Sequence, residues 1–189
     1  AAHLAQQDQF DYRMKLLAGK HRFQKVLEKV TRVSKWGRRL PKGHGLGISI
    51  NKTRGSIAGA VIEVSTDVNG MLNLNKAWIA IDCGKVINPN TVRAQMEGGF
   101  TFGLSATLGE EITLKDGRVE QSNFHDYSIL RLKGSPEISV EIIESGNEIG
   151  GVGEVAVPLA APALTNAIFS SSGRRIRSLP LSKHGIKIA

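Results

Sequence analysis

Residues 56–82, which read SIAGAVIEVSTDVNGMLNLNKAWIAID, decide the fold. Ser56–Thr66 is largely apolar and rich in β-branched residues, and Met71–Asp82 alternates before it becomes continuously apolar. Both patterns predict β-strands. Between them, Asp67-Val68-Asn69-Gly70 has the composition of a tight turn, because Asn-Gly tolerates positive φ. The stretch therefore predicts a β-hairpin.

Helical periodicity precedes this hairpin. In residues 21–36 the apolar side chains recur three and four positions apart, at Phe23, Val26, Leu27, Val30 and Val33. Gly37 follows at a suitable C-cap position, and residues 8–17 predict a shorter helix with Asp8 as its N-cap. We interpret residues 37–47, GRRLPKGHGLG, as a loop.

The remainder of the chain mixes helices and strands. The predicted elements are a helix from Asn88 to Leu108 interrupted by Gly98, Gly99 and Gly103, a second hairpin over 111–120, a strand over 138–143, and a helix over 158–172 that ends at Gly173. This order predicts an α+β fold, with a mixed sheet, hairpins and packed helices.

The charge is distributed unevenly about residue 42. The chain carries a net charge of +8, yet residues 1–42 hold 11 basic and 3 acidic residues, and residues 43–189 hold 14 of each. We therefore distinguish a basic helical segment, 1–42, from an α+β domain, 43–189, the two forming one compact unit. The basic segment could bind phosphate or nucleic acid. A solvated helix face or a docking surface is favoured, because no aromatic stacking platform accompanies the charge.

Composition excludes several classes of protein. With 189 residues, 41% hydrophobic and 22% charged, the chain is expected to be globular. It has no apolar run of about 18 residues that would predict a transmembrane helix, and no apolar signal-peptide core. A single cysteine, Cys83, excludes an intrachain disulfide. The five histidines form no HxH or HExxH pattern, so no metal ligated by protein side chains is expected.

A glycine-rich stretch, GGVGEVAVP at Gly150–Pro158, precedes the last predicted helix. Glycines let the backbone approach a ligand closely, and amides at a helix N-terminus suit an anion. Glu154, if desolvated there, could serve as a general base. The alternative is a flexible turn in which Glu154 merely interacts favourably with the helix dipole.

Two further clusters have open interpretations. Gln95-Met96-Glu97-Gly98-Gly99 places adjacent glycines in a helix, at a cost of about 1 kcal/mol each. The two adjacent glycines suggest close packing there, against either a ligand or another helix. His125-Asp126 could be an acid/base pair, although such a pair more often satisfies the hydrogen bonds of a loop.

Taken together and in order, these motifs resemble the molybdenum hydroxylases, the superfamily of xanthine dehydrogenase and aldehyde oxidoreductase. The resemblance rests on DCGKVINP at 82–89, QMEGG at 95–99, and GGVGEVAVPLAAPALTNAIF at 150–169. The phrases QSNFHDYSILRL and RRIRSLPL look most like the large (beta) subunit of isoquinoline 1-oxidoreductase-type enzymes. The likeness runs from about Asp11 to Leu181. One departure is Val155, where the family usually has proline.

The resemblance implies a role for each motif. The chain would be the C-terminal portion of a molybdopterin-binding domain in a longer large subunit, which hydroxylates an N-heterocycle or an aldehyde with oxygen from water. Glu154 would be the general base. Its burial among glycine, valine and alanine would raise its basicity. The cofactor would be molybdopterin, in its cytosine dinucleotide form, with molybdenum. Its binding residues would be Gln95, Gly98, Gly99, Gly150, Gly151, Val152 and Gly153, with the glycines of the loop exposing backbone amides.

The resemblance also implies partners: the rest of the large subunit, a small subunit with iron–sulfur clusters, and a small aromatic heterocycle or aldehyde as substrate. No nucleic-acid partner is expected, the isolated chain is expected to be inactive, and its compartment is left open. Two alternatives remain at this point. The chain could be a free-standing basic module that binds phosphate or nucleic acid, or a domain that keeps the fold without the chemistry.

Overall fold

The computed structural model describes residues 1–188 and is built on one mixed sheet. Its strands are β1 (His44–Thr53), β2 (Ser56–Thr66), β3 (Leu72–Asp82) and β6 (Glu137–Ile142), in the order β1-β2-β3-β6. β1 pairs with β2 and β2 pairs with β3 in antiparallel fashion, whereas β6 runs parallel to β3. The predicted central hairpin and the mixed sheet are confirmed.

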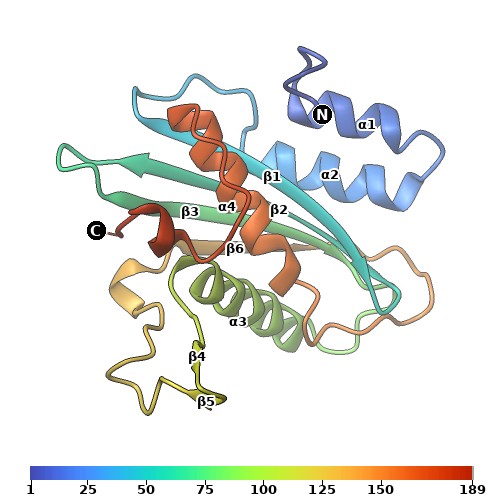
Figure 1. Ribbon diagram of the computed structural model, residues 1–189. Coiled ribbons are helices and arrows are strands. Elements are labelled where there is room, and N and C mark those ends of the chain that lie inside the picture. The colour runs from blue at the N-terminus through green and yellow to red at the C-terminus, as the bar shows by residue number, and fades with distance from the viewer. Residues whose placement is uncertain (189) are drawn as a thin grey trace.

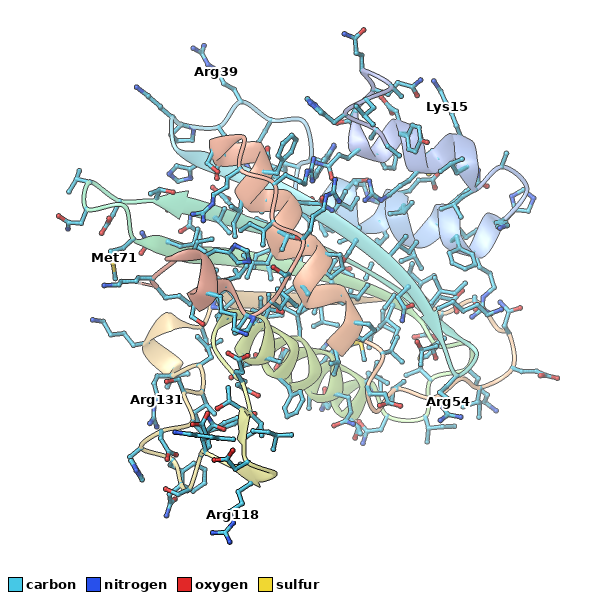
Figure 2. The ribbon with its side chains drawn as sticks, in the orientation of Figure 1. Lys15, Arg39, Arg54, Met71, Arg118 and Arg131 are labelled. Atoms are coloured by element: carbon cyan, nitrogen blue, oxygen red, sulfur yellow. The ribbon has the colours of Figure 1, made fainter. Side chains whose placement is uncertain are left out.

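Helices cover both faces of this sheet (Figure 1). One face carries the N-terminal helices and the other carries α3 and α4. The helices and the short remaining elements are α1 (Gln9–Leu16), α2 (His21–Val33), α3 (Pro89–Leu108), β4 (Leu114–Lys115), β5 (Arg118–Val119), the 3₁₀ turns η1 (Leu132–Gly134) and η2 (Leu181–His184), and α4 (Val157–Ser172). The predicted second hairpin is therefore present but reduced to two residues a strand, in an arm that projects from the body with Arg118 at its tip (Figures 1 and 2).

The two-sided covering explains the apolar composition of β2. Ala58, Ala60 and Ile62 belong to the core shared with α3 and α4. Ile57 and Val61 belong to a second core, shared with α2. Because successive side chains of a strand point to opposite faces, a strand between two helical layers must be apolar throughout.

The interpretation of residues 37–47 as a loop is wrong in its second half, because β1 already begins at His44. The glycines of this strand, Gly45 and Gly47, serve packing and not a turn. A β-carbon on Gly45 would lie 2.6 Å from the backbone nitrogen of Ser171 in α4. The contact is reinforced by hydrogen bonds, since Ser49 Oγ donates to the carbonyl oxygen of Leu159 at 2.8 Å. The helix therefore lies directly on the strand.

The predicted interruption of the helix after Asn88 is also wrong. The helix α3 runs unbroken from Pro89 to Leu108, and the Asn88 side chain caps its first turn. The glycines are tolerated because tertiary packing uses at least one of them: a β-carbon on Gly103 would lie 2.5 Å from the carbonyl oxygen of Val157. The predicted N-cap Asp8 and the end of α4 at Gly173 are both confirmed.

The basic helical segment, residues 1–42, packs onto the rest of the chain. Val26, Leu27 and Val30 of α2 are fully buried against the sheet. Three of its cations pair with acids of the sheet, in the ion pairs Arg22–Asp82, Lys29–Glu141 and Arg38–Glu63. Part of the excess charge is therefore used in docking. Within residues 1–188, no helix is both long and apolar enough to cross a membrane.

Candidate functional site

The candidate site lies where the N-terminal half of α3 meets residues 143–156, which connect β6 to α4 and which we call the glutamate loop. Gln95 on α3 donates from Nε2 to the carbonyl oxygen of Gly153, 3.3 Å away. The two motifs singled out from the sequence are 58 residues apart in the chain, and this hydrogen bond brings them side by side.

Glu154 follows Gly153 directly, and its side chain is exposed. The backbone on either side is anchored: Val152 packs against the main core, and Val155 is buried with 1% of its surface exposed. The expectation that glycine, valine and alanine bury the carboxylate is wrong for this chain, because these residues hold the backbone and leave the carboxylate facing outward. Valine at 155 retains an anchoring role without proline.

Gly150 and Gly151 pack against the turn between β1 and β2, where Arg54 lies (Figure 2). A β-carbon on Gly150 would lie 2.7 Å from the backbone nitrogen of Ser56. The amide of Gly150 donates to the carbonyl oxygen of Cys83 at 2.9 Å, and that of Gly151 to Arg54 at 2.8 Å. These two amides are thus occupied within the chain, and the glycines hold the loop against the sheet.

The next three residues of the loop differ in their backbone hydrogen bonding. The backbone N–H groups of Val152, Gly153 and Glu154 make no hydrogen bond to any residue in 1–188. They are therefore unoccupied within the described chain and can donate to a ligand.

Gly98 and Gly99 face different surroundings. Beyond the backbone of its own helix, a β-carbon on Gly98 would meet no atom of the described residues within 4 Å, whereas one on Gly99 would touch Ala156 at 3.5 Å, an ordinary contact. Helix packing therefore explains Gly103 and is compatible with Gly99, but it does not explain Gly98. The free amides, the side chain of Gln95 and the open surface of Gly98 provide donors, an acceptor and room, which fit a flat polar group such as a pterin.

Asp82 is a feature of the site that the sequence did not reveal. Its carboxylate is fully buried at the end of β3. It accepts hydrogen bonds from Arg22 Nε and Nη2 at 2.8 and 2.9 Å, from Ser145 Oγ at 2.6 Å, and from the amide of Gly84 at 2.9 Å. Burial acts to raise the pKa of Asp82, but the hydrogen bonds from Arg22, Ser145 and Gly84 outweigh it and hold that pKa below its ordinary value.

The pair His125-Asp126 serves the loop that follows β5. Asp126 accepts from the backbone amides of Ser122 and Asn123 at 2.8 and 3.0 Å, and these bonds lower the pKa of Asp126 to about 2. His125 is 3.5 Å away and mostly exposed. The structure favours the interpretation of this pair as loop capping. Within residues 1–188, no group of three or more His, Cys, Asp or Glu side chains is arranged to hold a metal ion.

Comparison with known proteins identifies the family and several relatives of this chain. The profile of a family described as "Molybdopterin cofactor-binding domain" matches residues 22–136. The chain is 34% identical over 178 residues to isoquinoline 1-oxidoreductase subunit beta of Brevundimonas diminuta, covering 92% of this chain and 23% of that protein. It is 30% identical over 206 residues to a membrane-bound aldehyde dehydrogenase (pyrroloquinoline-quinone) of Gluconacetobacter polyoxogenes, covering 95% of this chain and 26% of that protein.

A solved structure shares the fold. Quinoline 2-oxidoreductase from Pseudomonas putida 86 superimposes with a TM-score of 0.60 at 26% identity, over 67% of this chain and 17% of that one. The chain spans about a quarter of the length of the first two curated relatives. The resemblance seen in the motifs and the predicted α+β fold are both confirmed. The chain belongs to the molybdopterin cofactor-binding domain family of the molybdenum hydroxylases.

Proposed function

We propose that this chain is the C-terminal portion of the large subunit of a molybdenum hydroxylase, and that Glu154 is the general base in the hydroxylation of an N-heterocycle or an aldehyde. The observation that carries the proposal is the hydrogen bond from Gln95 to Gly153, which is the residue before Glu154. It joins the two segments that would face the cofactor and leaves the carboxylate of Glu154 directed outward.

The cofactor, molybdopterin in its cytosine dinucleotide form, would supply the two-electron redox chemistry when bound. Gln95 and the free amides of Val152 and Gly153 would hold its polar edge, with Gly98 and Gly99 allowing close approach. Gly150 and Gly151 would contribute indirectly, because their contacts with Cys83 and Arg54 set the path of the loop.

Glu154 would remove the proton from the water-derived oxygen as that oxygen attacks an electron-poor carbon. A glutamate does this well near neutral pH when water is excluded from it. Because the carboxylate is exposed in this chain, the remainder of the large subunit would have to cover it together with the substrate. An iron–sulfur small subunit would accept the electrons. On this basis the isolated chain would have no turnover.

The test uses the complete native protein that contains this chain, assayed with isoquinoline and with benzaldehyde and a dye as electron acceptor. Glu154→Gln is expected to lower kcat by at least about a hundredfold, the usual contribution of a general base, with molybdenum and pterin contents unchanged. Glu148→Gln is the matched control, since Glu148 is an exposed glutamate of the same loop. Wild-type turnover in a fully loaded Glu154→Gln enzyme would overturn the proposal.

A further inference from the structure

The hydrogen bonds around Asp82 reach the base of the glutamate loop. Ser145, which donates to the Asp82 carboxylate at 2.6 Å, is the third residue after β6. Its own hydroxyl accepts from Asn147 Nδ2 at 2.7 Å. A fully buried carboxylate with donors on several sides is held in one orientation, because any rotation would leave donors unpaired.

The segment after Asp82 is also tied to the loop through the backbone. The amide of Lys85 donates to the carbonyl oxygen of Asn147 at 3.0 Å, and the amide of Gly150 donates to that of Cys83 at 2.9 Å. Gly84 lies between Cys83 and Lys85 and packs closely on the loop, since a β-carbon there would lie 2.7 Å from the carbonyl oxygen of Asn147. The segment that follows Asp82, residues 83–85, therefore packs against residues 145–150 of the loop.

Arg22 could act in a simpler way, by docking α2 on the sheet. The chain contains a second ion pair that does only this: Lys29, on the same helix, contacts Glu141 of β6 at 2.8 Å. Neither member of that pair bonds to the glutamate loop in the described structure. Both ion pairs join α2 to the sheet. Only the Arg22–Asp82 pair is hydrogen-bonded to a residue of the glutamate loop, Ser145.

We propose that Asp82, held by Arg22, is a positioning residue that fixes the base of the glutamate loop through Ser145 and thereby sets the place of Glu154. This proposal rests on the proposed function of Glu154. It also gives the basic N-terminal helices a task in the site, since one of their cations holds the buried carboxylate.

The test compares four variants in the complete cofactor-loaded protein. Ser145→Ala and Arg22→Gln are expected to lower kcat by about tenfold with little change in KM, because a misplaced base lowers the rate of the chemical step more than substrate binding. Amide hydrogen exchange at Lys85, Gly150 and Gly151, whose amides are hydrogen-bonded at the base of the loop, is expected to accelerate in both. Lys29→Gln is expected to change neither, and Ser145→Thr, which keeps the hydroxyl, is expected to restore both.

Ser145→Ala leaves the Arg22–Asp82 pair intact, so it remains informative even where Arg22→Gln fails to fold. The proposal would be overturned if Ser145→Ala kept wild-type values of both kcat and amide exchange at Lys85, Gly150 and Gly151. An equal loss of kcat in Lys29→Gln would also overturn it, because Arg22 would then act only by docking α2 on the sheet. A failure of the function proposed for Glu154 is recognised separately, because Glu154→Gln would then stay active while the exchange results kept their pattern.

Discussion

Gly47 of β1 lies against Ala163 of α4 so closely that a β-carbon on Gly47 would overlap the carbonyl oxygen of Ala163. The atoms around this position are backbone, including the carbonyl carbon of Asn166 at 2.8 Å, so no side chain can rotate away. The packing of α4 on the sheet, and with it the direction in which the glutamate loop enters α4, depends on the absence of a side chain here.

Gly47→Ala is therefore expected to destabilise the chain by at least about 3 kcal/mol or to prevent folding, since overpacking against backbone forces elements apart. Urea unfolding of the 189-residue chain followed by circular dichroism measures the effect. The control is Gly109→Ala, where the new β-carbon would approach no atom nearer than Ser128 at 3.8 Å. Similar unfolding midpoints for the two variants would contradict this account of α4.

The helix α3 offers a matched pair of glycines for stability. Gly103→Ala would place a β-carbon 2.5 Å from the carbonyl oxygen of Val157, whereas Gly98→Ala would meet no described atom within 4 Å. The first is expected to destabilise by about 2 kcal/mol. The second is expected to stabilise by about 0.5–1 kcal/mol, as alanine does in a helix. Thermal unfolding would contradict this prediction if both variants shifted Tm in the same direction.

Gly98→Ala has a second expected consequence in the complete protein. If Gly98 lies against the cofactor, as proposed, the added methyl group occupies part of that surface and the molybdenum content per chain falls while the fold becomes more stable. Metal analysis and pterin fluorescence of the purified variant measure this directly. Full cofactor content with wild-type activity would show that Gly98 lies away from the cofactor.

Much of the fold follows from local patterns in the sequence. The hairpin of β2 and β3, the periodic face of α2 and the capped ends of α1 and α4 were all predicted, because each depends on residues close in the chain. The strand β1 was missed. Gly45 and Gly47 made this stretch look like a loop. They are required because α4, more than 100 residues later in the chain, packs directly onto the strand. Tertiary packing overrode local propensity there.

The site was only partly predictable for the same reason. Residue spacing placed Gln95 and Glu154 in suggestive motifs, and the family resemblance supplied their roles, but only the fold brings Gln95 to Gly153. The partner of Asp82 could not be inferred from the sequence, since Arg22 is one of 11 basic residues in the first 42. Only the way α2 packs on the sheet brings Arg22 to Asp82.

Stability is expected to depend on the ionisation of Asp82. Its pKa lies below the ordinary value of 3.8 in the folded chain, so the unfolded chain binds a proton more readily. The stabilisation is present above about pH 4–5 and is lost as the pH falls through the folded pKa. Asp82→Asn is expected to be about 3 kcal/mol less stable at pH 7, because Arg22 loses its carboxylate. Urea unfolding from pH 7 to pH 3 should show the difference in unfolding free energy between the wild type and Asp82→Asn narrowing. A difference that stays constant with pH would contradict the lowered pKa of Asp82.

Cys83 is a chemical probe of the order at the base of the glutamate loop, because its carbonyl oxygen accepts from that loop. The residue has 2% of its surface exposed, and burial, with a smaller contribution from the Asp82 carboxylate, raises the pKa of Cys83. Alkylation by iodoacetamide at pH 8 is therefore expected to be at least about a hundredfold slower in the native chain than in the urea-unfolded chain. The amide of Gly150 donates to the Cys83 carbonyl oxygen, so Ser145→Ala, which loosens the base of the loop, should accelerate the reaction, whereas Lys29→Gln should not. A wild-type rate in Ser145→Ala would mean that the loop protects Cys83 without help from Ser145.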